Sequence, residues 1–352
     1  ILRAQKNRIC IPPMVRFHLA GPDGLATPAH TAHYAALAAG EPGLIIQEAT
    51  CISPEGRLSE DQLGIWSDDH IPGLRQIVEA VHQADVPIFL QLHHAGIMSC
   101  GERKLCPVDY QYTYKPTNRG QPLADQIVTV QGEMLTPEEI ERIKQAFIDA
   151  GRRAYQAGYD GAELHGCHSY LLCQFLNRNI NRRTDRYSDG LTLVREIFAG
   201  IRAATSQDFV IGIRLGGFEP ALSDGIAHAR ALEAMGLQFL DVSYGFTGEM
   251  ELEAPGSAGF SKAVLAAGAI RRAVEIPVFA VDGIRTPADA ERVLQETGVA
   301  MADVGRSALV DPDWAKKARN GQAPGRCLGC KTCQWRIDPE KCPGRLLLRR
   351  GS

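Results

Sequence analysis

The alternation of two hydrophobic patterns constrains the fold of this chain more than any other feature. Short apolar runs rich in β-branched residues alternate with longer stretches in which apolar residues recur about every 3.6 positions. This order is typical of parallel strands joined by crossover helices, and eight such strands close a (β/α)8 barrel. We therefore expect an α/β chain with the TIM-barrel fold. The predicted strands are Ile9–Ile11, Leu44–Ile46, Ile88–Gln91, Ala162–Leu164, Phe209–Ile213, Phe239–Val242, Val278–Val281 and Ala302–Val304.

Local signals mark where the helices begin. Thr136 followed by Pro137 supplies an N-cap and a proline at the first helical position, and Thr286 followed by Pro287 repeats the device. We assign residues 1–322 to a single barrel domain and residues 323–352 to a short Cys-rich tail.

A long stretch without helical or strand periodicity, about residues 96–136, separates the third strand from its helix. It contains Pro107, Pro116 and Pro122. A loop of this length after a barrel strand is usually functional, so we expect a flap over the site, with a solvated insertion as the alternative.

Composition narrows the class of partner. The 352 residues carry a net charge of -3, with 45% hydrophobic and 22% charged residues, which gives no general electrostatic reason to expect nucleic acid or an anionic membrane as partner. No run of 18 apolar residues and no signal-peptide pattern is visible. We expect a cytoplasmic protein with a small-molecule partner, and the sequence leaves a homo-oligomer open.

Catalytic residues of this fold lie at the carboxyl ends of the strands and in the loops that follow them. Polar residues are frequent at these positions. They include Gln91, His93, His94, His165, His168, Tyr170, Arg214 and Arg306, together with Pro13, Met14, Ala49 and Gly305.

The segment His165–Tyr170 is the most distinctive of these groups. Two imidazoles three residues apart, with the Tyr170 phenol two residues beyond, can converge on one small polar target. Hydrogen-bonded structural histidines are the alternative. A metal site is a further one, although no third ligand with conventional spacing follows His168.

The turns after the seventh and eighth strands predict a phosphate site. Gly283 and Gly305 permit close approach of the backbone, and Arg306 supplies a charge-assisted hydrogen bond. Arg214 ends an apolar strand, where its charge can stabilise a reduced flavin or form an internal salt bridge with a carboxylate.

These residues resemble the Old Yellow Enzyme family of FMN-dependent oxidoreductases, from Asn7 to about Trp314. The resemblance rests on motifs whose order and spacing are specific. They are Asn7–Met14, Gly43–Ala49, Pro54–Arg57, Gln91–Gly96, His165–Tyr170, Gln174–Leu176, Asn181–Tyr187 and Gly305-Arg306.

The resemblance implies FMN as cofactor, NAD(P)H as co-substrate, and reduction of the C=C bond of an α,β-unsaturated carbonyl compound. His165 and His168 would then bind the substrate oxygen, and Tyr170 would donate the proton. Val15 stands where the family often has a Thr or Cys that touches the flavin, and Phe17 stands where one branch has a substrate-binding Tyr. The implied flavin contacts are Pro13, Met14, Ala49, Gln91 and Arg214, and the implied phosphate contacts are Gly283, Gly305 and Arg306.

Other activities remain compatible with this sequence. A flavoprotein with the same barrel can catalyse the oxidative direction instead, as a flavin-dependent desaturase or an amine dehydrogenase. A non-catalytic flavin-binding redox sensor is the alternative from another class.

Four of the ten cysteines cluster near the end of the chain. Cys327, Cys330, Cys333 and Cys342 lie within 16 residues, a density that packing does not require. The branch of the family similar to 2,4-dienoyl-CoA reductase carries a [4Fe-4S] cluster in this region. We expect an iron–sulfur cluster, with tetrahedral zinc or unliganded thiols as alternatives.

Overall fold

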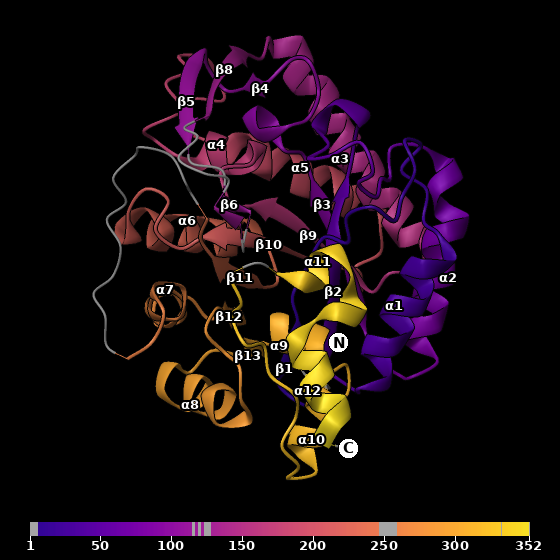
Figure 1. The fold of residues 1–352 in the computed structure, drawn as a ribbon. Helices are drawn as coiled ribbons and strands as arrows, with labels where there is room; N and C mark the ends of the chain where they lie inside the picture. The colour runs from indigo at the N-terminus through magenta and orange to yellow at the C-terminus, as the bar shows by residue number, and fades with distance from the viewer. Residues whose placement is uncertain are drawn as a thin grey trace.

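The computed structural model describes residues 6–114, 117–118, 121–122, 128–245, 259–331 and 333–351. Eight parallel strands close a barrel in the order β1-β13-β12-β11-β10-β9-β3-β2 (Figure 1). Each predicted strand overlaps one of them, so the TIM-barrel prediction is confirmed. The strands are β1 (Ile9–Ile11), β2 (Leu44–Cys51), β3 (Ile88–His93), β9 (Gly161–Gly166), β10 (Val210–Gly216), β11 (Leu240–Ser243), β12 (Val278–Val281) and β13 (Met301–Asp303).

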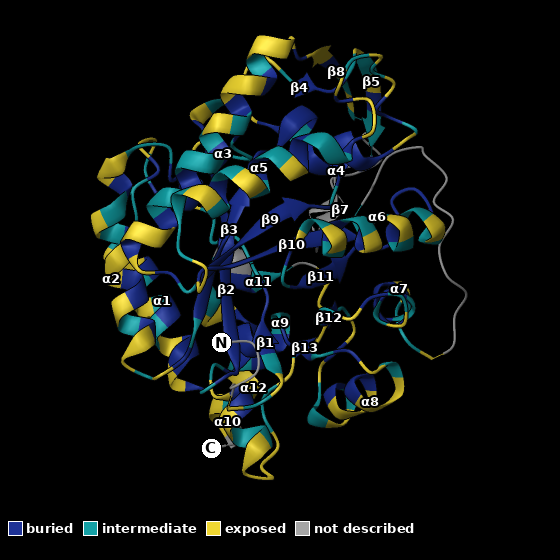
Figure 2. Ribbon diagram, turned by 180° about the vertical axis from the view of Figure 1, so that it is seen from behind, coloured by how far each residue is buried: buried dark blue, intermediate teal, exposed yellow. Residues whose placement is uncertain are grey.

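Helices surround the barrel, with exposed residues on their outer faces and buried residues toward the strands (Figure 2). Thr136 and Thr286 form capping boxes with Glu139 and Asp289, as their sequence signals predicted. The surrounding helices are α1 (Pro28–Ala39), α2 (Ile71–His82), α3 (Pro137–Ala157), α4 (Leu171–Leu176), α5 (Leu191–Ala204), α6 (Leu222–Met235), α7 (Lys262–Arg271) and α8 (Pro287–Thr297).

Strand alternation divides the barrel interior into layers. Phe239, Asp241 and Ser243 lie two residues apart, so all three point to the same side of their strand. Phe239 stacks on Phe279 with ring centroids 5.1 Å apart, which closes the lower barrel with an aromatic layer. Gly212 leaves room for that layer, because a Cβ there would lie 2.3 Å from the Phe239 ring. Buried charges and then the site residues lie above it.

The flap after β3 contains regular structure. β4 (Leu105–Cys106), β8 (Val128–Met134) and β5 (Tyr110–Tyr114) form a three-stranded sheet, and β6 (Thr117–Asn118) pairs with β7 (Gln121–Pro122). Tyr112 stacks on Tyr114, with ring centroids 5.4 Å apart, and both line the site cavity. The segment is therefore more than a solvated insertion. Pro116 lies outside the described residues.

The last part of the chain contains four short helices along the side of the barrel formed by β1 and β2, namely α9 (Arg306–Val310), α10 (Trp314–Arg319), α11 (Gln334–Ile337) and α12 (Pro343–Gly351) (Figure 1). Trp335 and Cys342 pack against Leu309 and Val310 of α9. The guanidinium of Arg16 lies 4.7 Å from the centre of the Trp335 ring. No helix among the described residues is long and apolar enough to cross a membrane.

Candidate active site

The carboxyl ends of the barrel strands surround a cavity of about 930 Å³. This size suits a cofactor together with a small substrate. His93 and His94, which the sequence also singled out, are buried and do not line the cavity. The cavity does bring together all the residues to which the sequence assigned a role in catalysis, ligand binding or metal ligation. They are Pro13, Met14, Val15, Phe17, Ala49, Gln91, His165, His168, Tyr170, Arg214, Gly283, Gly305, Arg306, Cys327, Cys330, Cys333 and Cys342.

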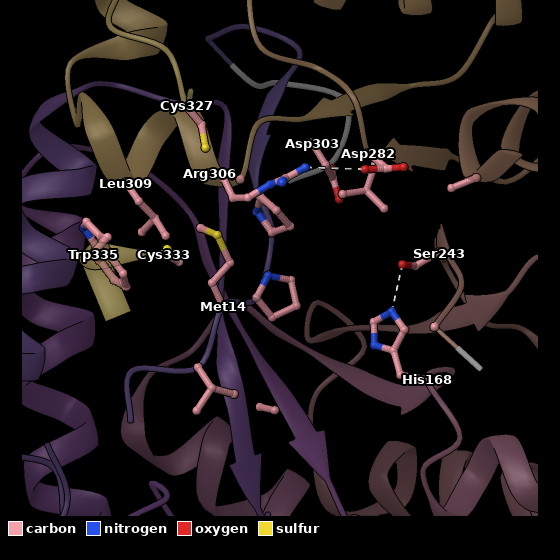
Figure 3. A pocket seen from close by; sticks show the side chains of 18 of the residues that line it. Met14, His168, Ser243, Asp282, Asp303, Arg306, Leu309, Cys327, Cys333 and Trp335 are labelled. Carbon is pink, nitrogen blue, oxygen red and sulfur yellow. Dashed lines mark hydrogen bonds and ion pairs between the residues drawn. The ribbon is translucent and has the colours of Figure 1, made fainter. Parts of the chain in front are cut away.

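The two predicted histidines belong to a row of hydrogen-bonded imidazoles. His93 Nδ1 lies 3.0 Å from His165 Nδ1, and His165 Nε2 lies 3.1 Å from His168 Nδ1. His168 Nε2 is 2.9 Å from the hydroxyl of Ser243, at the end of β11 (Figure 3). His165 and His168 are thus arranged in series, with His168 at the cavity end of the row.

Tyr170 lies against the same row. Its ring makes edge-on contacts with His93 at 4.5 Å and His165 at 4.7 Å between ring centroids. The backbone just before it adopts positive φ at His168 (65°) and Ser169 (62°), a conformation that costs non-glycine residues energy and is often found at functional sites. This local turn places the phenol and both imidazoles on one wall of the cavity.

A metal bound by the histidines is disfavoured, although a third ligand atom is close. Nitrogens of His165 and His168 and the sulfur of Cys167 all lie within 4.8 Å of one another. The imidazole nitrogens already bond to neighbours, however. Burial also raises the pKa of Cys167 well above its usual value, which favours the protonated thiol over the thiolate that binds metals.

Arg214 lies in a buried polar layer beneath the cavity. It forms an ion pair with Asp241, and Asp303 lies 3.8 Å away. Burial, and then the charge of Asp241, raises the pKa of both Glu163 and Asp303 well above the usual values. Burial thus favours the protonated form of these two carboxyls, and Asp241 is the direct ion-pair partner of the arginine.

The internal salt bridge that the sequence left open for Arg214 is therefore present, and the side chain also lines the cavity. Its Nε has no hydrogen-bond partner among the described residues. A buried donor of this kind suits the polar edge of a flavin ring.

The part of the cavity near the turns after β12 and β13 carries arginine side chains, and its glycines allow a ligand to approach the backbone closely. Gly283 has φ of 79°, and a Cβ at Gly305 would lie 3.2 Å from the sulfur of Met14. Arg306 lies here, 3.7 Å from Asp282 (Figure 3), and Arg285 also lines the cavity. Two arginines and two glycine turns fit the phosphate of FMN, which would share Arg306 with Asp282.

The cysteine tail forms another wall. In Figure 3, Cys327 and Cys333 lie across Met14 from His168 and Ser243. Tetrahedral zinc holds its thiolates about 3.8 Å apart, as follows from a Zn–S bond of about 2.3 Å. Among the described residues, no three of the tail sulfurs lie within 4.8 Å of one another. Zinc binding would therefore require the sulfurs to move closer together.

Some site residues were missed by sequence reasoning. Ser243 directly follows the predicted sixth strand and could have been found by its position. Asp241 and Glu163 interrupt apolar strands, which was a second usable signal. The cavity contacts of Tyr112 and Tyr114 depend on how the flap folds back, and no local pattern predicts them.

Comparison with known proteins identifies the family. The profile of the NADH:flavin oxidoreductase / NADH oxidase family matches residues 3–324. The chain belongs to this family. The resemblance to Old Yellow Enzyme that its motifs indicated is thereby confirmed, and the family implies FMN as cofactor and NAD(P)H as reductant.

Individual relatives agree with this assignment. The NADH oxidase of Thermoanaerobacter brockii is 35% identical over 343 residues, covering 92% of this chain; the chain spans 50% of that relative. The NADPH dehydrogenase of Halalkalibacterium halodurans is 35% identical over 323 residues, 89% of this chain and 90% of the relative. An Old Yellow Enzyme homologue from Zymomonas mobilis superposes with a TM-score of 0.73 at 25% identity, covering 92% of this chain and 91% of that one.

Proposed function

We propose that the chain is an FMN-dependent ene-reductase that reduces the C=C bond of α,β-unsaturated carbonyl compounds. The observation that carries this proposal is the grouping of His165, His168 and Tyr170 on one wall of a cavity with Arg214 beneath it. FMN, when bound, supplies the hydride that it has received from NAD(P)H.

The side chains of this wall stabilise charge and move a proton. Hydride addition to an enone places negative charge on its carbonyl oxygen, and imidazole N–H donors at the His165–His168 pair stabilise that charge. The Tyr170 phenol then protonates the α-carbon. Phe17, which also lines the cavity, has no hydroxyl with which to bind the substrate oxygen.

The cofactor assignment predicts that the purified protein releases FMN and not FAD. The two glycine turns and Arg306 form a site for a terminal phosphate, whereas the sequence has no GxGxxG dinucleotide fingerprint. Mass spectrometry of the released flavin measures this. Release of FAD would contradict the assignment.

The role of the histidines predicts that His165→Ala and His168→Ala each slow enone reduction roughly ten- to a thousandfold, while FMN stays bound. Tyr170→Phe should slow the enone half-reaction and spare flavin reduction by NAD(P)H. Stopped-flow kinetics of each half-reaction decide the matter. Equal slowing of both halves in Tyr170→Phe would point to a structural role.

The same experiments separate the alternatives. A desaturase or amine dehydrogenase would bleach its flavin with a saturated ketone or an amine and not reduce enones. A redox sensor would bind flavin but show no turnover after NAD(P)H addition.

We propose further that the tail cysteines hold an iron–sulfur cluster, with Cys327, Cys330, Cys333 and Cys342 as ligands. All four line one cavity, and a four-iron cluster holds its cysteine sulfurs farther apart than one zinc ion does. Such a cluster would carry single electrons. Iron, sulfide and zinc assays on anaerobically purified protein test this, and absence of all three would leave the thiols without a metal role.

A further inference from the structure

The imidazole row extends deeper than the substrate wall. His93 is fully buried and is not among the residues that line the cavity, yet its Nδ1 lies 3.0 Å from Nδ1 of His165. The row continues through His168 to the hydroxyl of Ser243. Its members come from β3, β9 and β11 and from the turn after β9, so it links the core of the barrel to the site.

The two inner rings are neutral at physiological pH. Burial lowers the pKa of His93 to about 3, and it lowers the pKa of His165 well below the usual value. A neutral imidazole carries one proton, so one of its nitrogens donates and the other accepts. With His168 neutral as well, the row can run in only two directions, with every ring donating toward Ser243 or every ring donating toward His93.

The surroundings of His93, at the buried end of the row, favour the arrangement in which every ring donates toward Ser243. His93 Nε2 is buried and has no hydrogen-bond partner among the described residues. A proton there would be an unpaired buried donor, which is costlier than an unpaired acceptor. The proton then belongs on His93 Nδ1, which donates to His165. His165 must in turn donate from Nε2 to His168.

The neighbouring His94 carries its proton on the other ring nitrogen, Nε2. The amide of Gly96 donates to His94 Nδ1 at 3.1 Å, so the proton of a neutral His94 stays on Nε2 although that nitrogen has no partner among the described residues. Adjacent histidines thus have opposite proton positions: the Gly96 amide at Nδ1 fixes that of His94, whereas the unpartnered Nε2 decides that of His93.

We propose that His93 is a positioning residue that sets the proton positions of His165 and His168, so that the row presents an N–H donor to the substrate. This inference rests on the proposed function, because the oxygen of an unsaturated carbonyl compound would replace Ser243 as the final acceptor. It narrows the oxygen-binding role proposed above for the His165–His168 pair: His168 is the donor that touches this oxygen, and His165 and His93 act through it.

The packing around the row supports a fixed arrangement. A Cβ at Gly245 would lie 2.6 Å from the His168 ring, so the glycine provides the space that the ring occupies. The rings of His93 and Tyr170 meet edge-on at an interplanar angle of 88°. His93 therefore contacts both the proposed proton donor, Tyr170, and His165.

Nuclear magnetic resonance of the full chain with FMN bound, labelled with ¹⁵N-histidine, tests the proton positions directly. Neutral imidazoles protonated at Nδ1 and at Nε2 have distinct ¹⁵N shifts, and single substitutions assign the signals. We expect His93 to carry its proton on Nδ1, and His165, His168 and His94 to carry theirs on Nε2. A proton on Nε2 of His93 would overturn the proposal.

A pair of matched variants tests the consequence for the site. In His93→Asn the side-chain amide can still donate to His165, whereas His93→Leu has similar size and no donor. We expect His93→Leu to raise the dissociation constant of phenol, whose oxygen stands in for that of the substrate, about tenfold, in line with other residues that orient a functional histidine. The asparagine variant should restore most of this affinity.

The outcomes separate this inference from the proposed function. If the two variants and the unchanged chain bind phenol with equal affinity, the proposed role of His93 is wrong, whatever the enone activity. If no enone is reduced while the ¹⁵N pattern and the phenol affinities follow the expectation, the ene-reductase proposal fails and the imidazole row stands. If the rate of flavin reduction by NAD(P)H fell by the same factor as the phenol affinity, this would also contradict a specific role for His93.

Discussion

Glu48 is a fully buried carboxyl group one residue before Ala49, a proposed flavin contact. It accepts a hydrogen bond from the Arg16 amide at 2.7 Å and one from the Tyr34 hydroxyl at 3.1 Å. Burial outweighs these contacts and raises its pKa from 4.5 to about 7. The folded protein therefore binds a proton at Glu48 that the unfolded chain releases between about pH 4.5 and 7.

This predicts a stability that falls as pH rises through that window. Stability due to protonated Glu48 is fully present below pH 4.5 and lost by about pH 7, and the shift corresponds to about 3 kcal/mol. Glu48→Gln, which mimics the protonated form, should remove this part of the slope. Urea unfolding at a series of pH values measures it, and the exposed Glu60→Gln serves as control. An unchanged slope in Glu48→Gln would contradict the prediction.

At the scale of elements, helix boundaries follow from local chemistry. The Thr136 hydroxyl accepts from the Glu139 amide at 3.2 Å, and the Glu139 carboxylate accepts from the Thr136 amide at 2.9 Å. These bonds satisfy donors at the start of α3 that no helical carbonyl reaches. The same signal was readable in the sequence because a cap involves only neighbouring residues.

Loss of the cap should cost about 1 kcal/mol of unfolding free energy. Thr136→Ala removes the accepting hydroxyl, whereas Thr136→Ser retains it and should cost little. Chemical denaturation of the three proteins provides the comparison. Equal losses in the alanine and serine variants would mean that the methyl group, and not the cap, matters.

At the scale of the whole molecule, the tail is held to the barrel by a small cluster. Trp335 packs on Leu309, and Arg345 donates to the Leu309 carbonyl at 3.0 Å. The guanidinium of Arg16 also lies over the indole. The tail thus helps to enclose the cavity that the barrel alone would leave open on this side.

Trp335→Ala should loosen the tail selectively. Truncation of a buried tryptophan costs roughly 3–5 kcal/mol, and this indole joins the tail to α9 and Arg16. Hydrogen exchange should accelerate in α12 and remain unchanged in the barrel strands. Trp66→Ala, which removes an indole far along the chain, should not affect α12. Acceleration across the barrel strands in Trp335→Ala would show that the tail is part of the global unfolding unit.

The sequence by itself determined the barrel, its eight strands, the capped helices and many of the residues that line the site. These features depend on the period of the hydrophobic pattern and on contacts between neighbouring residues, both of which a sequence displays. Arg214 was recognised as a buried charge for the same reason.

Only the tertiary structure decided which polar groups meet. His93 and His165 are 72 residues apart, and their hydrogen bond depends on the register of β3 against β9. The pairing of Arg214 with Asp241 and the placement of the tail cysteines on the cavity likewise join distant segments. Hydrogen bonds and ion pairs require distances and orientations within a fraction of an ångström, and these are set by the packing of the whole barrel and not by any local pattern.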